Sequence, residues 1–274
     1  MNQARSELVK KTLSTRDVSD MWEAAYRTPE NERFYERAFD RLLYLIEARS
    51  DASVVDVGCG PGFHAMRLAG RGYRVHAVDF SEPVLALARE NAQEANLNDK
   101  VTFGREDVTA LTFADSSHAL IVCWGVLMHV PEVERAIDEL ARVLAPGGTL
   151  IVSERNLHSL EARALRTLRW LGRRNGSVSR VPPGIERWKQ TSAGSLLTRT
   201  ADIPWLIDAF RDRGIELKSC LPGQFTEVYT KIRNRRLLAL VHRVNEFWFA
   251  RSWNPRLAAG NILLLRKPLR ESRT

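Results

Sequence analysis

The sequence has no apolar run that approaches the roughly 18–20 residues needed to cross a bilayer. No basic start is followed by an apolar stretch, so we expect no signal peptide. Only three cysteines occur in 274 residues, and Cys59, Cys123 and Cys220 lie too far apart for a metal site. Because they are odd in number, they cannot all pair within the chain. These absences predict a reduced, cytoplasmic protein rather than a secreted or membrane-spanning one.

Charge is distributed unevenly along the chain, whose formal net charge is +8. Residues 1–154 hold 17 Lys and Arg against 24 Asp and Glu, whereas residues 155–274 hold 24 against 9. A basic surface concentrates anions such as phosphorylated metabolites, acidic lipids or nucleic acid. The charge alone does not distinguish these partners, and improved solubility explains it as well.

Short apolar segments alternate with helical patterns through the middle of the chain. This order is typical of a doubly wound, mostly parallel, Rossmann-like sheet, in which ligands bind beyond the carboxyl ends of the strands. Two later segments complete a seven-stranded sheet, with helical insertions after strand five and between strands six and seven. The predicted strands are Ser53–Val57, Tyr73–Val78, Val101–Gly104, Ala119–Cys123, Thr149–Ser153, Ile215–Cys220 and Asn261–Arg266.

A glycine-rich turn follows the first predicted strand. Asp56 is near the end of that strand, and Gly58, Gly60 and Gly62 follow at alternate positions. Glycine permits a tight strand-to-helix turn, and a ligand can approach its backbone closely. The helix after the turn presents free N–H groups at its N-terminus. A dinucleotide fingerprint would place its third glycine at position 63, which is Phe63, so a dehydrogenase is disfavoured.

The segment Val54–Gly62 resembles motif I of the class I S-adenosylmethionine-dependent methyltransferases. The resemblance extends over residues about 50–154 and implies S-adenosylmethionine as cofactor. In that family, an acid after the second strand binds both ribose hydroxyls and its neighbour packs on the adenine; an acid after the third strand and the next backbone N–H bind the adenine edge. The resemblance assigns these roles, in order, to Asp79, Phe80, Asp107 and Val108.

Two residues inside the turn receive secondary roles from the same resemblance. Asp56 orders the loop and reaches the methionine amino group through water. Cys59 is expected to serve through its small size rather than through thiol chemistry.

The segment after strand four lies beside the transferred methyl group in the family. Here it contains Trp124 and His129. His129 is either a general base for an acceptor hydroxyl or a structural residue that ties down the loop. Trp124 either lines the cofactor or acceptor pocket or plugs the end of the sheet.

Several chemistries are disfavoured because their motifs are missing. No Asn/Asp-Pro-Pro-Tyr/Phe sequence follows strand four, which argues against methylation of adenine N6 or glutamine. No Pro-Cys pair occurs there either, which argues against methylation of cytosine C5. No cluster of His, Cys and carboxylates has metal-ligand spacing, so we expect no metal.

The acceptor is expected to bind between the N-terminal helical region and the basic C-terminal half. Trp22 and Tyr26 share one helix face and form either a lid over the cofactor or part of the core. Arg155 follows strand five and is a candidate for holding an anionic group. Residues 161–174 and 231–253 combine arginines with Leu, Phe and Trp. Such helices either close as a lid or lie on an acidic membrane surface.

These observations divide the chain into an N-terminal helical lid (1–48), a cofactor-binding core (49–154) and a basic acceptor or lid region (155–274). We expect methyl transfer to an O or N atom of a small acceptor. Two versions of this hypothesis are an anionic acceptor and a lipid-linked acceptor. The alternatives are a membrane-surface lipid or quinone methyltransferase, an RNA methyltransferase, and a non-catalytic cofactor-binding subunit. Nucleic acid is disfavoured because no recognisable binding module is present. The expected location is the cytoplasm, and peripheral binding to the inner membrane face is an alternative.

Overall fold

The computed structural model describes residues 2–47, 52–171, 178–191, 193–232, 234–251 and 253–269. Its centre is a seven-stranded sheet with the order β3-β2-β1-β4-β5-β10-β9. The strand pairs β1–β2, β2–β3, β1–β4 and β4–β5 are parallel, and β10 lies antiparallel between β5 and β9. This topology confirms the predicted doubly wound sheet. Its strands are β1 (Ser53–Val57), β2 (Arg74–Asp79), β3 (Val101–Arg105), β4 (His118–Trp124), β5 (Leu144–Arg155), β9 (Glu216–Pro222) and β10 (Gly260–Arg266).

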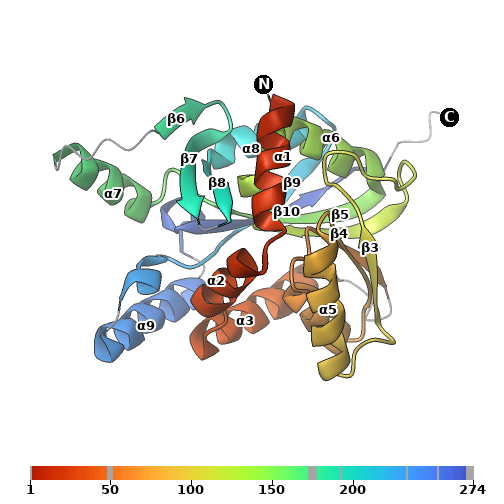
Figure 1. Cartoon of the computed structure of the whole chain (residues 1–274), viewed down its shortest axis with the longest axis horizontal. Helices are drawn as coiled ribbons and strands as arrows, with labels where there is room; N and C mark the ends of the chain where they lie inside the picture. The colour runs from red at the N-terminus through yellow and green to blue at the C-terminus, as the bar shows by residue number, and fades with distance from the viewer. Residues whose placement is uncertain are drawn as a thin grey trace.

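Helices cover both faces of this sheet, as Figure 1 shows. Alternate strand residues point to opposite faces, so Val54 packs in one core and Val55 in the other. One core lies under α6 and α8, and the other under α3, α4 and α5. Burial of the sheet on both faces explains its nearly continuous apolar strands. These helices are α3 (Pro29–Ile46), α4 (Phe63–Gly70), α5 (Glu82–Glu94), α6 (Val133–Val143) and α8 (Ile203–Arg211).

The N-terminal region is more ordered than the polar sequence before residue 16 indicates. It forms α1 (Asn2–Leu13) and α2 (Arg16–Tyr26) ahead of α3. Thr12 in α1 donates its hydroxyl to the carbonyl of Ser195, 3.1 Å away. This contact joins α1 to β8, and Figure 1 shows the two elements side by side. A contact distant in sequence therefore supports a helix that local pattern alone does not predict.

A second, three-stranded antiparallel sheet follows β5 and α7 (Leu160–Leu171). Its strands are β6 (Val178–Val181), β7 (Gly184–Thr191) and β8 (Gly194–Ala201). Gly, Ser and Pro in residues 175–184 predict a loop. That prediction is wrong for most of the described part, because residues 178–181 form β6 and Gly184 begins β7. Gly184 explains why the turn signal misled: its φ is 144°, and any Cβ there would collide with the Thr200 carbonyl, so this strand position requires glycine.

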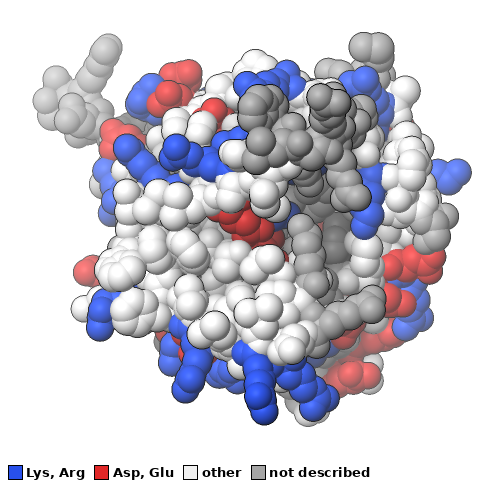
Figure 2. Space-filling view, turned by 90° about the vertical axis from the view of Figure 1, so that its left-hand side faces the viewer, with Lys and Arg blue, Asp and Glu red and all other residues white. Residues whose placement is uncertain are grey.

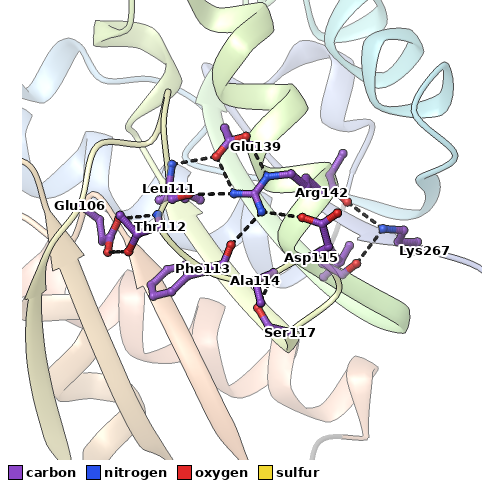
Figure 3. A network of polar contacts seen from close by, with 12 residues as sticks. Glu106, Leu111, Thr112, Phe113, Ala114, Asp115, Ser117, Glu139, Arg142 and Lys267 are labelled. Carbon is purple, nitrogen blue, oxygen red and sulfur yellow. Dashed lines mark hydrogen bonds and ion pairs between the residues drawn. The ribbon is translucent and has the colours of Figure 1, made fainter.

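One arginine fixes the loop between β3 and β4. Arg142 of α6 donates to the carbonyls of Leu111 and Phe113 at 2.8 and 2.7 Å. Its guanidinium also pairs with Glu139 and with Asp115. Figure 3 shows these contacts converging on the guanidinium from α6 and the loop. The planar group satisfies two backbone carbonyls and two carboxylates at once, which a lysine could not do with the same geometry.

We predict that Arg142→Ala lowers the free energy of unfolding by about 1–2 kcal/mol, because two loop carbonyls lose their donor. Chemical denaturation measures this change. Arg89→Ala is the control, since Arg89 forms an exposed ion pair with Glu82, and it should change stability by less than about 0.5 kcal/mol. Equal effects of the two variants would contradict the structural role of Arg142.

Candidate cofactor site

The glycine loop after β1 turns tightly beneath the segment that follows β4. Gly58 has a φ of 70°, and a Cβ there would lie 2.5 Å from a methyl group of Val126. Gly60 also has a positive φ, and no atom lies within 4 Å of the position that a Cβ would take there. Gly62 caps α4 with a φ of 84°. The backbone of the loop is therefore exposed to a ligand at Gly60, while Gly58 is required for packing.

Asp79 connects this loop to the end of β2. It is buried and accepts hydrogen bonds from the amides of Gly60, at 3.1 Å, and Ser81, at 3.0 Å. Burial raises the pKa of Asp79, and these amide donors oppose the shift. The carboxylate still has acceptor capacity for further donors such as hydroxyl groups.

Asp56 lies behind the loop, where it is buried and its Oδ2 atom has no hydrogen-bond partner among the described residues. Burial, and then the charge of Asp79, raise the pKa of Asp56 to about 7. The two buried carboxylates are a place where a cationic or N–H-bearing group would be stabilised.

Asp107 begins the loop after β3, and both its oxygens already accept hydrogen bonds. Oδ1 accepts from the amide and the hydroxyl of Thr109, at 2.9 and 2.8 Å. Oδ2 accepts from Nζ of Lys10 on α1, at 2.5 Å. Burial alone would raise the pKa of Asp107, but Lys10 and Thr109 hold it below its ordinary value. The carboxylate therefore stays ionised in the physiological range.

Gly58, Gly60, Asp79 and Asp107 line one cavity at the carboxyl ends of the central strands. It brings together seven of the predicted site residues: Gly58, Gly60, Asp79, Phe80, Asp107, Val108 and His129. The rest of the wall comes from the segment after β4, which the resemblance placed beside the transferred methyl group, and from α1, which the sequence did not indicate. Those additional residues include Ser6, Val9, Lys10, Leu13, Gly125, Val126 and Val130. Val9 and Leu13 are four apart on α1, a spacing that was the one available sequence signal.

Four residues predicted in the glycine loop and at the end of strand four do not line this cavity: Asp56, Cys59, Gly62 and Trp124. Cys59 is buried, which suits the small size expected of it. Trp124 stacks on Phe39, with ring centroids 5.3 Å apart, and contacts His64 at 5.0 Å. This packing agrees with a plug at the end of the sheet.

His129 lies in a short 3₁₀ turn, η1 (Leu127–His129), on the wall of the cavity. Its Nδ1 lies 2.7 Å from the carbonyl of Leu197 in β8, so Nδ1 carries the proton of the neutral ring. Burial lowers the pKa of His129 to about 4. Arg199 of β8 donates to the carbonyls of Leu127 and Val130, at 2.9 Å each. The second sheet therefore holds η1 against the cavity.

A polar cluster lies apart from this cavity and contains two predicted residues. Arg155 pairs with Glu227 at 3.2 Å, and Tyr26 lies close enough for Glu227 to be the largest cause of its raised pKa of about 12. Glu161 of α7 accepts hydrogen bonds from the Thr226 hydroxyl and the Glu227 amide. We call Tyr26, Arg155, Glu161 and Glu227 the acceptor-side cluster. The side chain of Trp22 lies outside the described residues.

Glu154 directly precedes Arg155 in β5 and is buried. Neither of its carboxyl oxygens has a well-aligned hydrogen bond among the described residues. Burial raises the pKa of Glu154 to about 8, against the opposing amides of Met128 and Leu127. This shift favours the protonated form of the Glu154 carboxyl group near neutral pH.

The fold and the cavity together have the features expected of a class I methyltransferase domain that binds S-adenosylmethionine. Residues 54–148 match the protein family described as "Methyltransferase domain". The matched part is about a third of the chain and contains the glycine loop, Asp79 and Asp107, so it supports the resemblance read from that loop.

Curated relatives align over less than half of the chain. The 27-O-demethylrifamycin SV methyltransferase of Amycolatopsis mediterranei is 32% identical over 119 residues, 43% of this chain and 44% of that protein. The ubiquinone biosynthesis O-methyltransferase of Coxiella burnetii is 36% identical over 103 residues, 38% of this chain and 43% of that protein. The chain therefore spans less than half the length of these relatives.

Solved structures match nearly the whole fold at low identity. Magnesium protoporphyrin IX methyltransferase from Synechocystis PCC 6803, with bound SAH, has a TM-score of 0.63, 18% identity and coverage of 95% of this chain and 99% of that one. The [4+2]-cyclase SpnF has a TM-score of 0.61, 20% identity and coverage of 97% and 96%. At these identities the likeness concerns the fold alone, and one of the two proteins is named as a cyclase.

We predict that Asp79→Asn weakens S-adenosylmethionine binding on the order of 100-fold, because a charged acceptor for two hydroxyls is lost. Isothermal titration calorimetry measures the affinity. Asp99→Asn is the matched control, since Asp99 is an exposed acid away from the cavity, and it should leave the affinity unchanged. An unaltered affinity in Asp79→Asn would rule out the ribose role.

We also predict that Lys10→Met speeds both association and dissociation of the cofactor about fivefold. The ion pair with Asp107 holds α1 across the cavity, and a half-buried pair contributes about 1 kcal/mol. Stopped-flow fluorescence measures both rates. Lys11→Met removes the same charge from an exposed neighbour and should change neither rate. If the two variants behave alike, α1 does not control exchange of the cofactor.

Proposed function

We propose that this protein is an enzyme that transfers a methyl group from S-adenosylmethionine to an O or N atom of a small acceptor. The observation that carries the proposal is the single cavity lined by the loop glycines, Asp79, Phe80, Asp107 and Val108. These residues come from separate strand ends and match the family's cofactor motifs in order. Methyltransferase names among the curated relatives support the same reaction class.

The chain's own residues fit the cofactor in three respects. The open backbone at Gly60 admits a ligand. Asp56 does not line the cavity, but its unpartnered carboxyl oxygen would bind the methionine amino group through water. Asp79 would hold the ribose hydroxyls, and Asp107 with the Val108 amide would hold the adenine edge. The bound cofactor supplies an electrophilic methyl group on a sulfonium. The protein's main contribution is then to align the acceptor with that group.

His129 is better suited to hold η1 than to act as the base. With a pKa of about 4, the buried ring of His129 holds a second proton in only about one molecule in a thousand at pH 7, so it is a weak base. The hydrogen bond from His129 Nδ1 to the Leu197 carbonyl also holds the imidazole ring in place. We therefore assign His129 to positioning of the cavity wall, and leave removal of the acceptor proton to solvent or to another group.

The acceptor-side cluster is our candidate for acceptor binding. The charge of Arg155 is already balanced by Glu227, so binding of an anionic acceptor would have to displace or share that pair. The pair offers both donors and acceptors beside the Tyr26 hydroxyl, which suits a polar, hydroxyl-bearing acceptor. This geometry favours a neutral acceptor over the anionic one that the sequence suggested.

Other functions of the same fold stay open to test. The cyclase among the solved structures illustrates that this fold also hosts reactions other than methyl transfer. RNA methylation and a non-catalytic cofactor-binding role remain alternatives. No described helix is long and apolar enough to span a membrane. A peripheral position at the inner membrane face, predicted from the basic helices, is part of this proposal.

Incubation with S-adenosylmethionine carrying a radiolabelled methyl group and a fractionated cell extract tests the proposal. We expect label in the small-molecule or lipid fraction, and none with Asp79→Asn at a cofactor concentration below its raised dissociation constant. Label in RNA would replace the small acceptor by a nucleic acid. Tight cofactor binding by calorimetry with no label in any fraction would refute methyl transfer and favour the non-catalytic role or a different reaction.

A further inference from the structure

Helix α9 (Arg235–Arg251) has an exposed apolar stripe on one side. Its four members follow one another at spacings of three and four residues, which places them on one helix face. Their exposed fractions are 48% for Leu237, 57% for Leu240, 41% for Val244 and 46% for Phe247. The opposite face of the helix is already packed against the protein, so the stripe is not a core face left uncovered by chance. Those buried residues are His242, Asn245, Trp248 and Phe249.

Trp253 extends the stripe beyond the C-terminal end of the helix. Trp253 is 47% exposed and lies edge-on to Phe247, with ring centroids 5.3 Å apart, and to Trp248, at 5.2 Å. The guanidinium of Arg251 lies over the Phe247 ring at 4.5 Å. A tryptophan and an arginine at the edge of an apolar patch are suited to the boundary between lipid headgroups and acyl chains.

Positive charge accompanies the stripe along the whole helix. Arg235, Arg236 and Arg243 are exposed and form no ion pair with the residues that the structure describes. The one acid in α9, Glu246, pairs with Arg33 of α3 at 3.3 Å. Figure 2, which faces the side where α7 and α9 lie in Figure 1, shows a broad uncharged area with Lys and Arg gathered above and below it.

We propose that α9 and Trp253 form a docking surface for an anionic lipid bilayer. The helix lies parallel to the membrane, its stripe enters the headgroup boundary, and its arginines contact lipid phosphates. A second copy of the chain is a poorer occupant, because a two-fold contact through this face would bring the two arginine rows together. Charge complementarity therefore selects an acidic lipid surface.

Docking would also determine how the acceptor reaches the enzyme, an inference that rests on the proposed function. The turn η2 (Val228–Lys231) directly follows Glu227 and precedes α9. A docked α9 would hold the acceptor-side cluster near the bilayer. An amphiphilic acceptor could then reach the cluster from the lipid without crossing bulk water. Vesicle binding is measured without methyl transfer, so the docking surface and the catalytic proposal can fail separately.

Vesicle flotation of the full chain tests the docking surface, with phosphatidylcholine alone and with phosphatidylcholine mixed with phosphatidylglycerol. We expect binding to the anionic vesicles only, and weaker binding as salt is added. The double variant L240S/F247S should lower the partition coefficient at least about tenfold. Tyr44→Ser removes an aromatic group that is 83% exposed on α3 and should bind as the unaltered chain does.

A second double variant, R236Q/R243Q, keeps the stripe and should reduce binding to anionic vesicles in the same direction. It keeps the proposal testable if L240S/F247S fails to fold, which circular dichroism and cofactor affinity would reveal. Absent flotation with anionic vesicles, or equal flotation of all variants, would overturn the proposal. A dimer by light scattering that L240S/F247S dissociates, without vesicle binding, would assign the face to a second copy instead.

Discussion

The hydrogen bond from the Gly60 amide to Asp79 is the contact on which the cofactor site depends. It joins the loop after β1 to the end of β2, so the two neighbouring strands present their ligand-binding groups as one surface. Gly58 permits the loop to pass beneath Val126, where any side chain would collide. Burial of Asp79 and Asp56 in the same place raises both pKa values, so a bound cation or hydroxyl would relieve an existing electrostatic cost.

Elements outside the cofactor-binding core complete the cavity. Lys10 brings α1 onto Asp107, and Arg199 brings the second sheet onto η1. Arg142 fixes the loop that carries Asp107 from the opposite direction. Each of these cations satisfies carbonyl or carboxylate oxygens on a segment with little regular structure. The cavity is therefore shaped by side chains on helices and strands that surround irregular loops, which is a common way to make a loop site rigid.

The two halves of the chain divide the work of the proposed enzyme by charge. The acidic half contains the carboxylates that would bind the cofactor, whereas the basic half contains α9 and three members of the acceptor-side cluster, Arg155, Glu161 and Glu227. Within the cluster, Glu227 neutralises Arg155, so the excess positive charge of the basic half lies mainly on exposed surfaces rather than in a pocket. This distribution favours a charged surface as its partner more than an anionic small molecule.

The parallel sheet, the glycine loop and the order of the acids Asp79 and Asp107 can be predicted from the amino-acid sequence, because these features depend on local patterns and strand ends. Neither α1 nor the second sheet could be predicted in this way: α1 is stabilised by distant contacts such as Thr12 with Ser195, and the second sheet contains a turn-forming glycine inside a strand. The ion pairs of Lys10 with Asp107 and of Arg155 with Glu227 depend on the folded arrangement of the chain. Spacing along a chain specifies which side chains share a face, whereas the pairing of charges depends on how the faces pack.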